Sequence, residues 1–170
     1  MTITIIGLGP GDANLLTRRA WDVIGRAAEI YVRTARHPTL DGLPPTVTVH
    51  SFDAIYESTP QFAEVYTRVA DEVLRLGALG DVIYAVPGHP LVGEATVTDI
   101  LRRAPEQGLK VEIVDGLSFV EPALTALGVD ALDGLQVLDA LEIAAAHHPP
   151  IDPDRPALLA QLYCEPSPAT

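Results

Sequence analysis

The sequence predicts an α/β protein built around a mostly parallel sheet, and two observations support this prediction. Short apolar and β-branched runs alternate along the chain with stretches whose apolar residues recur at helical spacing. Several of the expected strands also run directly into loops that are rich in glycine or proline. In folds of this class, helices cover both faces of the sheet, and ligands bind where the strands release their loops. We therefore expect a binding site at the carboxyl ends of the strands.

The first expected strand covers residues 2–6, in which isoleucine and threonine predominate. Residues 7–12 follow as a turn with three glycines, which would let the backbone come close to a ligand because no Cβ intervenes. An amphipathic helix is expected over residues 15–24. Asp12 suits two compatible roles, as the N-cap of this helix and as a ligand contact.

The remaining elements are expected from periodicity and from the residues that interrupt it. A helix begins after Ser58-Thr-Pro60 and is ended by Gly77, because serine and proline favour a helix start and glycine favours a helix end. Two more helices follow strand-ending loops, one over residues 94–103 and a short apolar one over residues 119–127. Further strands are expected over residues 29–32, 46–50, 81–86, 110–114 and 157–163.

The alternation of strands and helices predicts two domains. The first series ends near Asp115, so we expect an N-terminal α/β domain over residues 1–114, which carries the glycine-rich loop. A partial C-terminal α/β domain is expected over residues 115–170. Beyond Gly128 alanine and leucine dominate and a loop rich in proline follows, so no further element is assigned before residue 157.

Composition narrows the classes of partner. The 170 residues carry a formal charge of −12, which argues against a nucleic-acid partner because such proteins neutralise phosphates with lysine and arginine. Cys164 is the only cysteine, and the adjacent His147 and His148 lack a nearby carboxylate, so no metal is expected. No membrane-spanning stretch is apparent, and the N-terminus resembles a strand rather than a signal peptide. We therefore expect a cytoplasmic protein.

The glycine-rich turn does not fit the common phosphate-binding motifs. A dinucleotide fingerprint needs a third glycine where Asp12 stands, and Pro10 stiffens the turn. The sequence also lacks the Gly-Lys-Ser/Thr of a P-loop, and no Gly-x-Ser-x-Gly or cysteine–histidine signature is present. The loops therefore favour a reaction that depends on positioning, such as methyl transfer from a sulfonium cofactor that already carries its leaving group.

Three motifs together resemble the tetrapyrrole (corrin/porphyrin) methylase family. Gly-Leu-Gly-Pro-Gly-Asp at residues 7–12 matches the N-terminal motif of that family in full. Pro-Gly-His-Pro-Leu-Val-Gly at 87–93 resembles its Gly-Asp-Pro loop, and Val-Asp-Gly-Leu-Ser at 114–118 resembles its Pro-Gly-x-Ser-Ser segment. The second motif is most similar to the methylase-like N-terminal domain fused to MazG-type nucleotide pyrophosphohydrolases. The resemblance implies two α/β domains, S-adenosylmethionine bound in the cleft between them, and a homodimer.

The resemblance also implies a set of binding residues. The expected cofactor contacts are Gly88, His89, Val92, Ser118, Leu162 and Tyr163. Pro10, Gly11 and Asp12 are expected to form the loop on the substrate side, and no residue is assigned a catalytic role. His89 replaces the aspartate of the family and Asp115 its proline. Because the family continues for several more strands, we expect the second domain to be truncated.

The implied function is that of an S-adenosylmethionine-dependent methyltransferase with an unidentified small-molecule acceptor. The alternative is a non-catalytic regulatory or dimerisation domain of a MazG-type fusion, which the replacement at His89 favours. A nicotinamide-dependent oxidoreductase is a third hypothesis, which the missing third glycine disfavours. If the acceptor carries carboxylates, we expect Arg33 or Arg36 to line the cleft. The competing interpretation is that both arginines lie on the ordinary surface.

Overall fold

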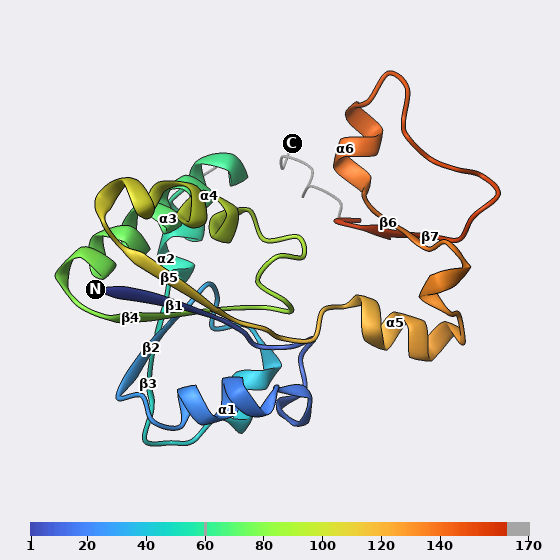
Figure 1. The fold of residues 1–170 in the computed structure, drawn as a ribbon. Helices are drawn as coiled ribbons and strands as arrows, with labels where there is room; N and C mark the ends of the chain where they lie inside the picture. Colours follow the sequence, from blue (N-terminus) through green and yellow to red (C-terminus); the bar gives the residue numbers. More distant parts are fainter. Residues whose placement is uncertain (60, 163–170) are drawn as a thin grey trace, which may run out of the picture. The chain divides into compact units, whose positions relative to one another are not determined.

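The computed structural model describes residues 1–59 and 61–162, and the chain divides into two compact units, Met1–Phe119 and Val120–Thr170. The expected boundary lay after residue 114, five residues before this division. The strands of the first unit are β1 (Thr2–Gly7), β2 (Glu29–Val32), β3 (Thr48–Ser51), β4 (Val82–Val86) and β5 (Lys110–Val114). Its α-helices are α1 (Arg18–Ile24), α2 (Asp53–Ser58), α3 (Phe62–Leu79) and α4 (Ala95–Arg103), with shorter 3-10 turns η1 (Ala13–Leu15), η2 (Pro38–Gly42) and η3 (Pro105–Gln107) (Figure 1).

The five strands form one parallel sheet in the order β3-β2-β4-β1-β5, which confirms the expected fold class. Ile5 lies between Tyr84 of β4 and Ile113 of β5 in the register of the sheet. Because the strands are parallel, their carboxyl ends meet at one edge. The loops that follow β4, β1 and β5 therefore leave the sheet side by side.

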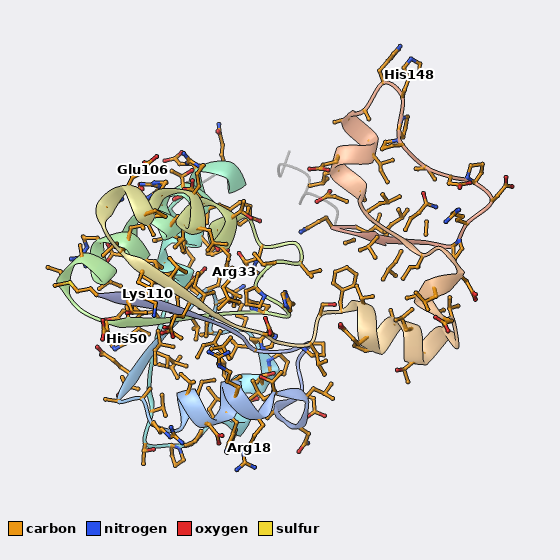
Figure 2. The ribbon with its side chains drawn as sticks, viewed as in Figure 1. Arg18, Arg33, His50, Glu106, Lys110 and His148 are labelled. Atoms are coloured by element: carbon orange, nitrogen blue, oxygen red, sulfur yellow. The ribbon has the colours of Figure 1, made fainter. Side chains whose placement is uncertain are left out.

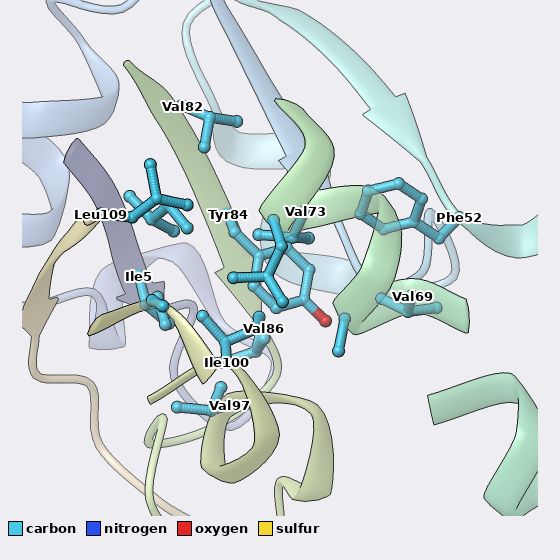
Figure 3. Close-up of a cluster of buried hydrophobic side chains, with 14 of the residues drawn as sticks. Ile5, Phe52, Val69, Val73, Val82, Tyr84, Val86, Val97, Ile100 and Leu109 are labelled. Atoms are coloured by element: carbon cyan, nitrogen blue, oxygen red, sulfur yellow. The ribbon is translucent and has the colours of Figure 1, made fainter. Parts of the chain in front are cut away.

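Helices cover both faces of this sheet (Figure 1). Ile3 and Ile5 contribute to the larger core with residues of α3 and α4, and Figure 3 shows Tyr84 at the centre of that cluster. Ile6 and Leu8 belong to a second core, which includes residues of α1. The alternation of side chains along a strand assigns the neighbouring Ile5 and Ile6 to opposite faces, so β1 contributes buried side chains to both cores.

Helix α3 continues to Leu79, beyond the end that was expected at Gly77. A Cβ built on Gly77 would lie 2.7 Å from Cγ1 of Ile3, so glycine at this position allows the helix to pack closely against β1. The backbone N–H of Gly80 instead caps the helix by donating to the carbonyl of Leu76. The prediction was wrong here because a glycine needed for packing looks in sequence like a helix terminator.

The segment after β1 also differs from the expectation. Asp12 accepts a hydrogen bond from the N–H of Asn14 at 2.8 Å and caps the short turn η1, whereas the helix expected over 15–24 begins only at Arg18. Leu16 adopts extended backbone and separates η1 from α1. Thr17 caps α1 by accepting from the N–H of Ala20 at 3.2 Å. The capping role of Asp12 is thus confirmed, but for a different turn.

The second unit contains a pair of parallel strands. β6 (Gln136–Asp139) pairs with β7 (Ala157–Ala160), and α5 (Val120–Leu127), η4 (Ala131–Asp133) and α6 (Ala140–Ala145) are its helical segments. The expected strand over 157–163 ends at Ala160, and the last position of that range lies outside the described residues. Among the residues that the structure describes, no helix combines the length and the apolar character needed to span a membrane.

Candidate functional site

Three loops meet at the carboxyl edge of the parallel sheet. They are residues 7–12 after β1, residues 87–93 after β4 and residues 115–118 after β5, the segments that carry the three sequence motifs. Gly9 and Gly88 exchange two backbone hydrogen bonds, with N···O distances of 3.2 and 2.8 Å. The first two loops therefore cross and hold one another by their backbones.

The third loop joins this crossing through Gly116. A Cβ built on Gly116 would lie 2.8 Å from Cα of Gly7 and closer still to the carbonyl oxygen of Gly88. A Cβ on Gly7 would lie 2.5 Å from that same oxygen. Glycine at position 7 therefore allows three loops of the protein to pack closely against one another. The sequence had instead indicated that it lets the backbone approach a ligand.

The structure brings four of the expected cofactor contacts together. Gly88 has a positive φ of 67°, and a Cβ built on it would lie 3.9 Å from Cα of Ser118, which is buried. The N–H of Val92 donates to the carbonyl of His89 at 3.0 Å. Leu162 belongs to the second unit and its side chain is exposed, while Tyr163 lies outside the described residues.

Both ring nitrogens of His89 face polar partners. Nδ1 accepts from the N–H of Leu91 at 3.0 Å, which places the proton of the neutral ring on Nε2. Nε2 lies 3.5 Å from Oδ1 of Asp115. His89 and Asp115, two of the positions at which the motifs depart from the family pattern, therefore face each other across two loops. Because Nδ1 is engaged by the backbone, His89 is placed to orient the loop rather than to accept a proton from a ligand.

The expected substrate-side loop lies beside η2. A Cβ built on Gly11, whose φ is 124°, would lie 3.9 Å from the ring of Pro38. Pro10 is half-buried and Asp12 is exposed. Oδ1 of Asp12 also accepts from the side-chain amide of Asn14 at 3.0 Å, so this carboxylate is engaged in a local turn.

A pocket of about 330 Å³ opens beside this edge, at the carboxyl end of β2 and against α2. We call it the Arg33 pocket, and it is lined by Arg33, Thr34, Arg36, Asp53, Tyr56 and Glu57. Arg33 lies within the first unit, with its side chain 25% exposed, whereas Arg18 lies on the outer side of α1 (Figure 2). Both arginines that the sequence singled out thus line a pocket within the first unit.

A chain of buried hydrogen bonds fixes Arg33 from behind. Nη1 of Arg33 donates to Oε2 of Glu94 at 2.8 Å, and Oγ1 of Thr96 donates to Oε1 of the same carboxylate at 2.6 Å. The hydroxyls of Thr96 and Tyr84 lie 3.0 Å apart. Burial raises the pKa of Glu94, and the charge of Arg33 offsets part of that effect. Sequence reasoning missed Glu94, which follows the 87–93 loop directly.

The loop from Arg33 to His37 is held in shape by a second carboxylate. Oδ2 of Asp53 accepts from the N–H of Ala35 at 2.8 Å. Partial burial acts to raise the pKa of Asp53, but its hydrogen bonds, first of all that from Ala35, lower it. Burial and the neighbouring charge of Arg33 lower the pKa of His37, so its ring is neutral near pH 7. Within the described ranges, His, Cys, Asp and Glu side chains form no group of three or more suited to a metal ion.

Comparison of the sequence with known proteins identifies the family to which the chain belongs. The sequence profile of the tetrapyrrole (corrin/porphyrin) methylases matches residues 2–166. The chain is 38% identical over 144 residues to the uncharacterized protein YabN of Bacillus subtilis, covering 84% of this chain and 29% of that protein. It is 29% identical over 122 residues to the diphthine methyl ester synthase of Dictyostelium discoideum, covering 71% of this chain and 43% of the synthase.

Solved structures share the fold. The uroporphyrin-III-C-methyltransferase of Thermus thermophilus superposes with a TM-score of 0.61 at 22% identity, covering 81% of this chain and 60% of that one. The methyltransferase CobJ superposes with a TM-score of 0.60 at 22% identity, covering 81% and 55%. The chain thus spans less than half the length of the two curated relatives and about three fifths of these structures. With its profile match over nearly the whole sequence, the chain belongs to the tetrapyrrole (corrin/porphyrin) methylase family.

Proposed function

We propose that this chain is the donor-binding part of an S-adenosylmethionine-dependent methyltransferase whose acceptor is a small molecule. The observation that carries the proposal is the meeting of residues 7–12, 87–93 and 115–118 at one edge of a parallel sheet. Open α/β sheets bind ligands at this edge. Membership of the methylase family supports the reaction class, and methyltransferases are among the proteins that share the fold.

The chemistry of the loops fits a cationic cofactor without phosphates. None of the three loop segments contains lysine or arginine, and they include the carboxylates of Asp12 and Asp115. A phosphate-bearing ligand would meet repulsion here, whereas a sulfonium would not. Gly88, His89, Val92 and Ser118 would hold the cofactor, and when bound S-adenosylmethionine supplies an activated methyl group.

The residues of the chain contribute position rather than proton transfer. The paired hydrogen bonds of Gly9 and Gly88 fix the crossing, and His89 holds its own loop through the N–H of Leu91. A nucleophile that is already deprotonated therefore suits this site best. Correct alignment of two bound reactants lowers the barrier substantially without a general base.

Titration with S-adenosylhomocysteine by calorimetry tests the proposal. We expect saturable binding, and we expect Gly88→Ala to weaken it about tenfold or more, because φ at Gly88 is positive and the loop must distort. Gly108→Ala is the matched control: φ there is 68°, nothing lies within 4 Å of the added Cβ, and position 108 follows η3 outside the three loops. The control should bind like the parent chain. Absence of heat at high micromolar ligand would contradict the proposal.

A second candidate is a non-catalytic regulatory or dimerisation domain of a MazG-type nucleotide pyrophosphohydrolase fusion. The engagement of Nδ1 of His89 by the backbone favours it, because a histidine whose free acceptor nitrogen is already occupied suits binding without chemistry. The greater length of YabN is compatible with a multidomain arrangement. We expect a homodimer in either case, which sedimentation equilibrium would test. Binding of S-adenosylhomocysteine together with no methyl transfer to small-molecule acceptors would favour this candidate.

A further inference from the structure

His89 closes its own loop with an acceptor that a proton can remove. The backbone N–H of Leu91, two residues along the chain, donates to Nδ1 of His89 at 3.0 Å. An asparagine or aspartate at this position could make the same turn with a side-chain oxygen. Imidazole differs from these side chains, because its protonated form has donors on both nitrogens and cannot accept a hydrogen bond. Protonation of His89 therefore turns Nδ1 from an acceptor into a donor that faces another donor.

The turn at His89 is connected to both neighbouring loops. Gly88, the preceding residue, forms the backbone crossing with Gly9 of the first loop. On the other side, Oδ1 of Asp115 in the third loop lies 3.5 Å from Nε2 of His89. The carbonyl of Asp115 also accepts from Oγ1 of Thr17, the N-cap of α1, at 2.9 Å. A change in the turn at His89 therefore acts on the packing of all three loops.

The charges around His89 allow its ring to take up a proton. Among the described residues, Asp115 is the charged group in contact with the ring, and its carboxylate favours the protonated form. Asp12 of the first loop is engaged in its own turn, and Glu94, which follows the second loop, is bound to Arg33. None of the three loop segments carries a lysine or arginine. No cation of these loops therefore opposes protonation of His89.

We propose that His89 is a proton-controlled positioning residue of the cofactor site: its neutral ring holds residues 87–93 closed for the cofactor, and its protonated ring releases them. The proposal rests on the proposed methyltransferase function, because only then does the loop position a cofactor. Histidine is the side chain whose charge ordinarily changes between pH 5 and 8. Since only the neutral ring accepts from Leu91, cofactor binding weakens as the pH falls through this range. A turn closed by asparagine, which does not titrate, would not respond in this way.

Calorimetric titration with S-adenosylhomocysteine at pH 7.5 and pH 5.5 tests the effect of the proton on binding. The parent chain should bind about fivefold more weakly at the lower pH, the factor that corresponds to one net hydrogen bond. His89→Asn offers an uncharged oxygen to the N–H of Leu91, so its affinity should be the same at both pH values. Asp115→Asn removes the carboxylate that favours the charged ring, so the midpoint of the pH profile should move to lower pH. His50→Asn replaces an exposed histidine of β3 outside the three loops, and this matched control should keep the pH dependence of the parent chain.

Nuclear magnetic resonance of the parent chain observes the turn without any ligand. The amide proton of Leu91 should shift with pH at the same midpoint as the ring resonances of His89, and an amide that ignores this titration would overturn the inference. Binding of S-adenosylhomocysteine with equal affinity at both pH values, or an unchanged pH dependence in His89→Asn, would reject this inference alone. Absence of binding at either pH, while the Leu91 amide follows His89, would instead reject the proposed function and leave the proton-controlled turn in place.

Discussion

Replacement of Gly116 by alanine is expected to destabilise the fold by about 3 kcal/mol, the upper end of the usual range for overpacking. The added Cβ would lie 2.8 Å from the backbone of Gly7 and closer still to the carbonyl oxygen of Gly88. Neither neighbour is a flexible side chain, so two loops must move together to admit one methyl group. Urea denaturation followed by circular dichroism would measure the loss, and S-adenosylhomocysteine binding should disappear with it.

Gly80→Ala provides the matched control. Gly80 has an extended backbone with φ of 179°, and an added Cβ would meet nothing within 4 Å. The free energy of unfolding should change by less than about 0.5 kcal/mol, as for other unconstrained surface positions. Equal stability of Gly116→Ala and Gly80→Ala would show that the three loops are not closely packed at residue 116.

The strands of the sheet could be predicted well because a short apolar run between turn residues fits few secondary structures other than a buried strand. β2 and β5 occupy the expected residues 29–32 and 110–114. The motif-bearing loops were predictable for the same reason, since each follows one of these strands. Their meeting at one edge then follows from the parallel arrangement of β4, β1 and β5.

The elements that sequence reasoning missed are not short apolar runs set off by turn residues. β6 and α6 lie in a stretch dominated by alanine and leucine, where strand and helix periodicities are hard to separate. Helix α2, over Asp53–Ser58, is only six residues long. Gly77 misled for a different reason, because its role depends on Ile3, more than 70 residues away in sequence.

In the candidate site, too, the role of a side chain depends on a residue that is distant in sequence. Arginines at 33 and 36 could be singled out as cations beside a strand end, but the partner of Arg33 could not. Glu94 is 61 residues away and becomes a neighbour only when β2 pairs with β4. Sequence can therefore suggest which groups carry charge, whereas the register of the sheet decides which of them are paired.

Replacement of Arg33 by methionine is expected to cost 3–5 kcal/mol of stability near pH 7, which is the usual range when one partner of a buried ion pair is removed. The side chain of Glu94 is only 2% exposed, so its charge would remain without a counterion. Arg36→Met removes an exposed arginine of the same pocket and should change stability by less than about 1 kcal/mol. Urea denaturation of both variants at pH 7.5 would compare them.

The pH dependence of the free energy of unfolding of Arg33→Met identifies the cause of the lost stability. Burial already raises the folded-state pKa of Glu94 above 4.5, and without Arg33 the opposing attraction is gone, so this pKa should rise further. A raised carboxyl pKa favours the protonated fold; its contribution is complete below the unfolded pKa and is lost as pH rises through the folded value. The deficit of Arg33→Met should therefore shrink towards pH 4.5. Adding Glu94→Gln should remove this pH dependence, and its persistence would mean that Arg33 stabilises the fold by packing rather than by charge.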